Sequence, residues 1–160
     1  AANFIKSKYP NVRFSVLGDF DIENISNINE KDLAILNPHN FVTFLGFKNN
    51  IKDYIINSSC VVLPSYREGL SKSLLEACSI GRPIIASNVP GCKEIVSEDY
   101  NGFLCNPRDY KDLALSLEKF INLPNYKKKL FGERSRNKAE KKFDENKVIS
   151  RYMTEIEKYV

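Results

Sequence analysis

Short strand patterns alternate with helical patterns along most of the chain, and this alternation restricts the fold more than any other feature of the sequence. Apolar runs with β-branched residues, bounded by Gly, Pro or small polar residues, predict strands. They lie at residues 12–17, 41–45, 60–63, 83–86 and 102–105. Helical patterns lie between them at residues 27–36, 51–57, 71–80 and 91–97. Strands that alternate with helices form βαβ units, so we expect an α/β fold, a parallel sheet with helices on both faces.

The rest of the chain is predicted to be helical. Residues 109–121 carry an apolar face behind an acidic first turn. Pro124 interrupts this pattern, and two further helices are expected at residues 125–142 and 144–160. With 160 residues, of which 42% are hydrophobic and 28% charged, the chain has the length and composition of one soluble globular domain. No apolar run approaches the roughly 20 residues that span a bilayer.

Small, polar or glycine residues follow the predicted strands at their carboxyl ends. Gly18 follows the first strand, Gly46 and Phe47 follow the second, and Ser65 follows the third. Ligands of open α/β sheets bind at the carboxyl ends of the strands. Glycine there lets a ligand approach the backbone, although many such glycines only make a turn. Together these residues indicate one ligand-binding edge of the sheet.

Two glutamates flank a strand-to-helix turn at this edge. Glu68 lies in the loop after the third strand, and Glu76 lies on the helix that follows. Ser71 is a favourable N-cap for that helix, and the N–H groups around Gly69, Leu70 and Ser71 form a positive pole suited to phosphate. Carboxylates accept hydrogen bonds from hydroxyls, so a ligand with a central phosphate and hydroxyl-rich groups on both sides satisfies the whole turn. Taken alone, each glutamate is better interpreted as a solvated acid, in a loop for Glu68 and on a helix surface for Glu76.

The net charge of +4 is unevenly distributed. From Ile121 onward there are 11 Lys or Arg and 6 Asp or Glu, whereas the first 120 residues hold 13 and 14. A basic helical end can face an anionic membrane surface or another acidic partner, or it can be a solvated helix face. The run Lys127–Lys129 has no aromatic and basic stacking surface beside it, so we expect no binding of nucleic acid.

Neither a metal site nor a hydrolase triad is expected. The four cysteines contain no C-x-x-C pair and read as reduced core thiols of a cytosolic protein; they are Cys60, Cys78, Cys92 and Cys105. The sequence Asp19-Phe20-Asp21 is a D-x-D match that supplies too few fixed oxygen ligands for magnesium, and we interpret it as a chance match. The single histidine, His39, makes a Ser-His-Asp arrangement implausible.

The turn from Glu68 to Glu76 resembles the E-x7-E motif of the retaining GT-B glycosyltransferases, glycosyltransferase family 4, also called group 1. The resemblance covers roughly Val12 to Phe120 in register; its segments are Phe14–Asp19, Val42–Phe47, Pro64–Ser87, Pro90–Val96, Asn101–Asp109 and Leu113–Ala114. It implies that residues 1–160 are the nucleotide-sugar (donor) binding domain. That domain is a Rossmann-like, doubly wound parallel sheet, the C-terminal half of a GT-B fold, here with a helical C-terminal tail.

The resemblance also implies a role for each acid. Glu68, the residue assigned to catalysis, accepts hydrogen bonds from hydroxyls of the donor sugar, with the N–H groups of Gly69 and Leu70 close by. Glu76 holds the ribose hydroxyls of the nucleotide. The backbone N–H groups of Leu70 and Ser71 meet the diphosphate.

Residues at other strand ends complete the implied donor site. Gly46 and Phe47 border the base, Gly18 approaches the phosphates, and Ser65 belongs to the same donor-binding set. No metal and no other cofactor is implied, because the nucleotide sugar is itself the substrate.

The chain departs from the family pattern in three ways. Ser71 stands where the family often has proline, and as an N-cap it is expected to have little effect. The family's donor domain opens with a strand followed by an Arg and a Lys, and no such segment precedes Ala1; the acceptor-binding N-terminal domain is missing too, so we expect a fragment. Since that first strand is central in a 3-2-1-4-5-6 sheet, the strand 12–17 should either pair directly with the strand 60–63 or leave a gap filled by another chain.

The expected enzyme is a hexosyltransferase-type glycosyltransferase of cell-surface polysaccharide synthesis. It would move a sugar from a UDP-sugar, or another NDP-sugar, to a glycan or lipid-linked acceptor with retention. The acceptor binds the missing N-terminal domain, so the fragment alone should turn over little. We expect it either in the cytoplasm or at the inner face of the cell membrane. Two alternatives stay open, a GT-B-fold nucleotide-sugar epimerase and a non-catalytic nucleotide- or partner-binding module.

Overall fold

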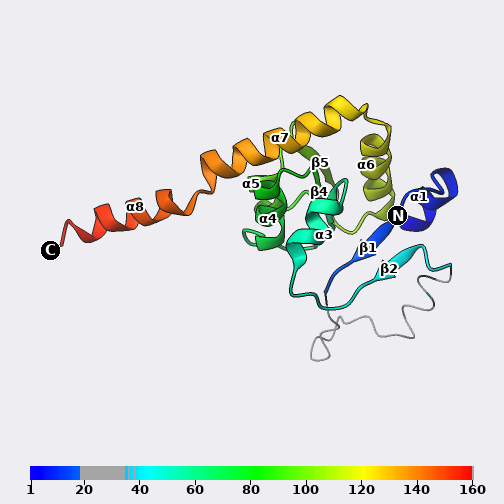
Figure 1. Ribbon diagram of the computed structural model, residues 1–160, viewed down its shortest axis with the longest axis horizontal. Helices are drawn as coiled ribbons and strands as arrows, with labels where there is room; N and C mark the ends of the chain where they lie inside the picture. Colours follow the sequence, from blue (N-terminus) through cyan, green and yellow to red (C-terminus); the bar gives the residue numbers. More distant parts are fainter. Residues whose placement is uncertain (19–34, 36, 38, 160) are drawn as a thin grey trace. The chain divides into compact units, whose positions relative to one another are not determined.

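The structure is a computed structural model that describes residues 1–18, 35, 37 and 39–159 (Figure 1). Its elements follow in the order α1 (Ala2–Lys8), β1 (Phe14–Val16), β2 (Val42–Phe44), α3 (Ile51–Asn57), β3 (Val61–Leu63), α4 (Lys72–Ile80), β4 (Ile84–Ser87), α5 (Pro90–Ile95), β5 (Gly102–Cys105), α6 (Tyr110–Asn122), α7 (Asn125–Lys142) and α8 (Glu145–Ile156). The chain forms two compact units, Ala1–Tyr54 and Ile55–Val160. The helix predicted at residues 27–36 falls almost wholly outside the described residues, as does Asp19-Phe20-Asp21.

The first unit is built on two parallel strands. β1 pairs with β2 along its whole length, with Phe14 opposite Val42. Beyond the strands the pairing continues, because the N–H of Leu45 donates to the carbonyl of Val16 at 2.9 Å. The side-chain amide of Asn37 donates to the carbonyl of Val42 at 2.8 Å and accepts from its N–H at 3.1 Å. These bonds hold the two strands in a register that brings their carboxyl ends together.

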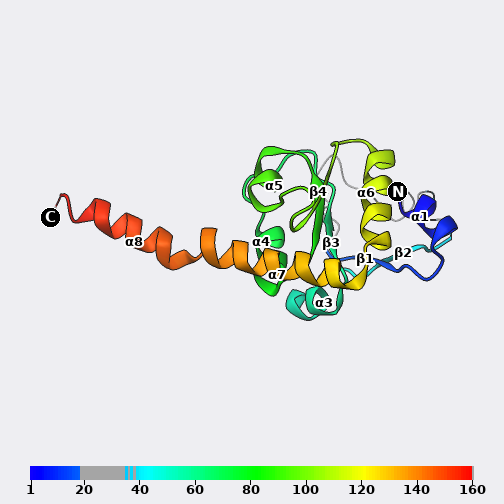
Figure 2. The same cartoon turned by 90° about the horizontal axis from the view of Figure 1, so that it is seen from above.

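The second unit contains a three-stranded parallel sheet in the order β3-β4-β5. All four residues of the central strand β4, Ile84–Ser87, are buried. A strand that is apolar and buried on both faces needs helices on both sides of the sheet. Figures 1 and 2 show this arrangement, with α4 and α5 on one side of the sheet and α6 on the other.

One apolar cluster fills the space between the sheet, α4 and α5. It contains mostly aliphatic side chains and two thiols, with its main members being Leu74, Ala77, Cys78, Ile84, Ala86, Cys92, Ile95 and Val96. Because residues alternate between the two faces of a strand, Ile85 of β4 points away from this cluster. The cluster anchors both helices whose first residues follow the carboxyl ends of β3 and β4.

Helix α7 packs against α4 through small residues. A Cβ atom on Gly132 would lie 2.4 Å from the carbonyl oxygen of Gly81, so glycine permits the close approach of these two backbones. The Cys78 thiol donates to the carbonyl of Ser135 at 2.9 Å, and the amide of the buried Asn101 donates to the Ser135 hydroxyl at 3.3 Å. In contrast, α8 contains no buried residue.

The structure corrects one expectation about the sheet. β1 pairs with β2 and β3 pairs with β4, and among the described strands no hydrogen-bonded ladder joins β1 to β3. Of the two alternatives expected for residues 12–17, the direct pairing with residues 60–63 is therefore wrong, and a gap filled by another chain stays a prediction.

Candidate functional site

Three loops of the second unit begin at one edge of its sheet. Since β3, β4 and β5 are parallel, their carboxyl ends lie at the same edge. The loops that start there are residues 64–71, 88–89 and 106–109. This edge carries six of the nine predicted site residues, namely Ser65, Glu68, Gly69, Leu70, Ser71 and, on the following helix, Glu76.

Glu68 borders a hollow at this edge. The hollow has a volume of about 560 Å³ and is lined by Tyr66, Arg67, Glu68, Gly69, Val89 and Pro90. The hydroxyl of Ser65 donates to Oε1 of Glu68 at 2.9 Å, which orients the carboxylate. A carboxylate can accept about four hydrogen bonds, so the half-buried Glu68 keeps acceptor capacity for hydroxyls of a ligand.

The first turn of α5 lies directly against the loop that carries Glu68. A Cβ atom on Gly91 would lie 1.6 Å from the carbonyl oxygen of Gly69 and 2.7 Å from that of Glu68. Only glycine fits here without displacing backbone. Burial, and to a lesser extent the charge of the nearby Glu68, raises the pKa of the Cys92 thiol on this helix.

Ser71 occupies the N-cap position of α4, as predicted, but its side chain does not cap the helix. Its backbone is extended and its carbonyl accepts the N–H of Leu75 at 3.0 Å. Its hydroxyl makes no capping hydrogen bond and lies 3.1 Å from the hydroxyl of Ser73 instead. The expected side-chain cap is therefore wrong, and the Ser71 hydroxyl is paired with that of Ser73. The N–H groups of the first turn do not donate to this hydroxyl and can donate to an anion instead.

Glu76 lies one turn into α4 with its side chain 39% exposed. Nζ of Lys72 is 4.0 Å from its Oε1, an i,i+4 pair in which the lysine side chain is 91% exposed. Such an exposed pair contributes little to stability. The carboxylate of Glu76 thus remains available to accept hydrogen bonds from a ligand at the start of the helix.

The remaining three predicted residues lie in the first unit. The N–H of Gly18 donates to the carbonyl of Gly46 at 3.2 Å, and both glycines have positive φ angles, 139° and 67°. The following residue, Phe47, is 66% exposed. The structure therefore brings Gly18, Gly46 and Phe47 together at the carboxyl ends of β1 and β2, as a group within their own unit.

Sequence reasoning missed two residues at the edge of the second sheet. Tyr66 lines the hollow, and the guanidinium carbon of Arg108 lies 4.9 Å from the centroid of its ring. Arg108 follows the last strand, so its place at this edge could have been found from the sequence. Its contact with Tyr66, which is distant in the chain, could not.

No cluster of three or more His, Cys, Asp or Glu side chains suited to a metal ion occurs among the described residues. Within the same residues, no helix is long and apolar enough to cross a membrane.

The chain is similar to known proteins over most of its length. A family model described as "Glycosyl transferases group 1" matches residues 1–142. The capsular polysaccharide biosynthesis glycosyltransferase CapM of Staphylococcus aureus is 30% identical over 139 residues, which are 87% of this chain and 36% of that protein. An N,N'-diacetylbacillosaminyl-diphospho-undecaprenol alpha-1,3-N-acetylgalactosaminyltransferase of Campylobacter jejuni is 36% identical over 114 residues, 70% of this chain and 29% of that protein. The chain thus spans about a third of the length of these relatives.

Solved structures share the fold. Anabaena HepE in complex with UDP superposes with a TM-score of 0.84 at 23% identity, covering 99% of this chain and 44% of HepE. The same protein has also been solved with UDP-glucose. At this level of identity the similarity shows the fold, which is the GT-B fold with its parallel sheets and flanking helices.

Proposed function

The chain belongs to the group 1 glycosyl transferases, and we propose that residues 1–160 are the donor-binding domain of a retaining enzyme of this group. The enzyme would transfer a hexosyl-type sugar from a UDP-sugar to a glycan or lipid-linked acceptor in the synthesis of a cell-surface polysaccharide. The names of the CapM and Campylobacter relatives support a role in glycan synthesis, and the UDP complexes of HepE support a uridine donor.

One observation carries the proposal: two carboxylates lie on either side of an uncapped helix start at the carboxyl edge of a parallel sheet. Glu76 would accept hydrogen bonds from the ribose hydroxyls, and Glu68 from hydroxyls of the donor sugar in the hollow. Between them, the N–H groups of Leu70, Ser71 and the first turn of α4 would bind the diphosphate. Gly18, Gly46 and Phe47 would border the phosphates and the base.

The first turn of α4 would also stabilise the leaving group. Transfer breaks the bond between the anomeric carbon and a diphosphate oxygen and forms a bond to the acceptor oxygen, so negative charge develops on the diphosphate. Fixed N–H dipoles at that place lower the energy of the transition state. Glu68 would orient the sugar; it is not assigned as a nucleophile.

The acceptor would bind to a further domain, so the 160-residue chain should bind donor and turn over little. The basic helix α7, with eight Lys or Arg and two Glu, could lie against the anionic inner face of the cell membrane, where lipid-linked acceptors are found. The same basic residues could also form a solvated helix face. In both cases the domain would bind its donor from the cytoplasm.

The test is the replacement Glu76→Ala, followed by calorimetric titration with UDP. Hydrogen bonds to a charged group contribute about 1.5–3 kcal/mol, so loss of the ribose contacts should weaken UDP binding roughly 10- to 100-fold. A matched control is Glu133→Ala on α7, because Glu133 forms a similar i,i+4 pair with Lys129 at 4.0 Å. UDP binding that is equally strong in wild type and Glu76→Ala would contradict the proposed function and favour a different role for this edge.

A further inference from the structure

Two loops at the carboxyl edge of the second sheet touch through a pair of side chains, Tyr66 and Arg108. The ring of Tyr66 lines the hollow beside Glu68, yet the residue is 61% exposed. So exposed a ring has few packing contacts that could fix its orientation. The guanidinium of Arg108 lies over it, 4.9 Å from its centroid, in the range where a cation is attracted to an aromatic face.

The backbone at Arg108 is in a conformation that costs energy for an arginine. Its φ angle is +62°, in the left-handed region that residues with a Cβ atom rarely adopt. Hydrogen bonds hold the backbone before and after Arg108 in place. Asp109 accepts the N–H groups of Lys111 and Asp112 at 2.9 and 3.0 Å, and the N–H of Asn106 donates to Asp112 at 2.7 Å. Glycine would relieve this strain, so an arginine here suggests that its side chain is used.

We propose that Arg108 is a positioning residue for the donor sugar. By lying over Tyr66, it holds that ring as a fixed wall of the hollow beside Glu68. The hollow therefore keeps its shape for the sugar, while the nucleotide is bound elsewhere on the edge. This inference rests on the proposed function of the site, and it adds a residue from the loop after β5 to a site otherwise built from the residues that follow β3 and β4.

The test compares two probes, UDP and UDP-glucose, in calorimetric titrations of the 160-residue chain and its variant Arg108→Asn. Asparagine tolerates the left-handed backbone but carries no cation. An exposed cation–π contact corresponds to roughly a two- to fivefold change in affinity. We expect UDP-glucose to bind more weakly by this factor, and UDP to bind as in wild type. Arg108→Lys keeps the charge without the planar group, so its affinity for UDP-glucose should lie between those of the wild type and Arg108→Asn.

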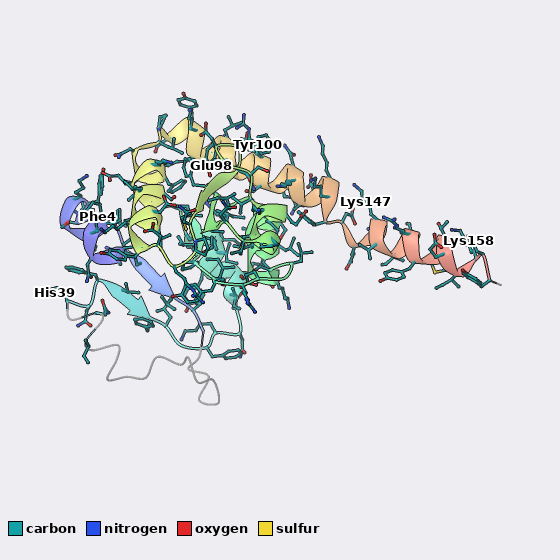
Figure 3. All side chains as sticks on the ribbon, turned by 180° about the vertical axis from the view of Figure 1, so that it is seen from behind. Phe4, His39, Glu98, Tyr100, Lys147 and Lys158 are labelled. Atoms are coloured by element: carbon teal, nitrogen blue, oxygen red, sulfur yellow. The ribbon has the colours of Figure 1, made fainter. Side chains whose placement is uncertain are left out.

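A matched control removes a similar contact at the other end of β5. Arg134 of α7 lies over the ring of Tyr100, 4.6 Å from its centroid, and Figure 3 shows Tyr100 beside α7. The replacement Arg134→Gln should leave the affinities for both probes unchanged. In a chain that already carries Tyr66→Leu, the change Arg108→Asn should have no further effect, because the ring that it positions is gone.

Each other outcome overturns the proposal. Unchanged affinities in Arg108→Asn would show that the contact is not used. An equal loss for UDP and UDP-glucose would place Arg108 on the nucleotide, and a persisting loss in the Tyr66→Leu chain would mean direct contact with the sugar. If the wild-type chain bound neither probe, the proposed function itself would fail, and this inference with it.

Discussion

At the scale of single residues, Gly91 decides how closely α5 can approach the loop that carries Glu68. A Cβ atom there would lie 1.6 Å from a backbone oxygen of Gly69, so Gly91→Ala must displace either the loop or the helix. Overpacking of this kind costs about 1–3 kcal/mol. We expect a lower urea midpoint, and weaker UDP-glucose binding because the loop that carries Glu68 moves.

The control for this prediction is Gly69→Ala, since a Cβ atom on Gly69 meets nothing within 4 Å and its φ angle is not positive. Its urea midpoint should stay close to that of the wild type. Equal midpoints for wild type and Gly91→Ala would show that the two backbones separate at no cost, which would contradict the close packing.

The same scale shows what local sequence can predict. Glu68 and Glu76 could be predicted to flank the turn, because their places follow from the strand before and the helix after them. Gly91 and Arg108 act on that turn from segments that are distant in sequence, so their roles depend on tertiary contacts. The local sequence also predicted that the side chain of Ser71 caps α4, and this prediction is wrong, since its hydroxyl is paired with that of Ser73.

At the scale of elements, α7 and α8 differ sharply in what they bury. Phe131 and Ser135 of α7 are buried, whereas every described residue of α8 is at least partly exposed. Short helices without tertiary contacts are only marginally stable in water. We predict that a chain ending at Phe143 keeps the urea midpoint of the full chain, whereas Phe131→Ala loses about 3–5 kcal/mol.

Amide hydrogen exchange supplies the second measurement, with faster exchange expected in α8 than in α7. A truncated chain with a clearly lower urea midpoint would show that α8 packs on the second unit, against the burial seen here.

The prediction of these elements from sequence was good for α3, α7 and β5, whose bounds match those of the structure. It was worse for the strands β1, β2 and β3, whose ladders are shorter than the predicted apolar runs.

At the scale of the whole molecule, the alternation of strands and helices was enough to predict parallel strands with helices on both faces of the larger sheet. It was not enough to predict which strands pair. Residues 12–17 were expected either to pair directly with residues 60–63 or to leave a gap, and no ladder joins β1 to β3 among the described strands. Pairing depends on topology across the full sheet, which no local pattern of residues 12–17 or 60–63 contains.

The pH dependence of stability also belongs to the molecule as a whole, because it adds the effects of four thiols. Burial raises the pKa of all four, Cys60, Cys78, Cys92 and Cys105. Unfolded thiols titrate at about pH 8.5, while the folded ones stay protonated to higher pH. The unfolded chain then binds fewer protons than the folded chain, so the free energy of unfolding should be at its full value below that pH and fall as the pH rises above it.

Lys138 acts in the opposite direction, because burial and the charge of Lys142 lower its pKa, so its contribution to stability increases with pH. Burial also lowers the pKa of the α-amino group of Ala1, so two groups act against four, and they should reduce the fall without reversing it. Urea midpoints measured with a reducing agent at about pH 7.5 and pH 9.5 check this, and the replacement Cys105→Ala should make the fall shallower by removing one of the four thiols. A midpoint that rises over this range would mean that the buried thiols do not govern the alkaline stability of the fold.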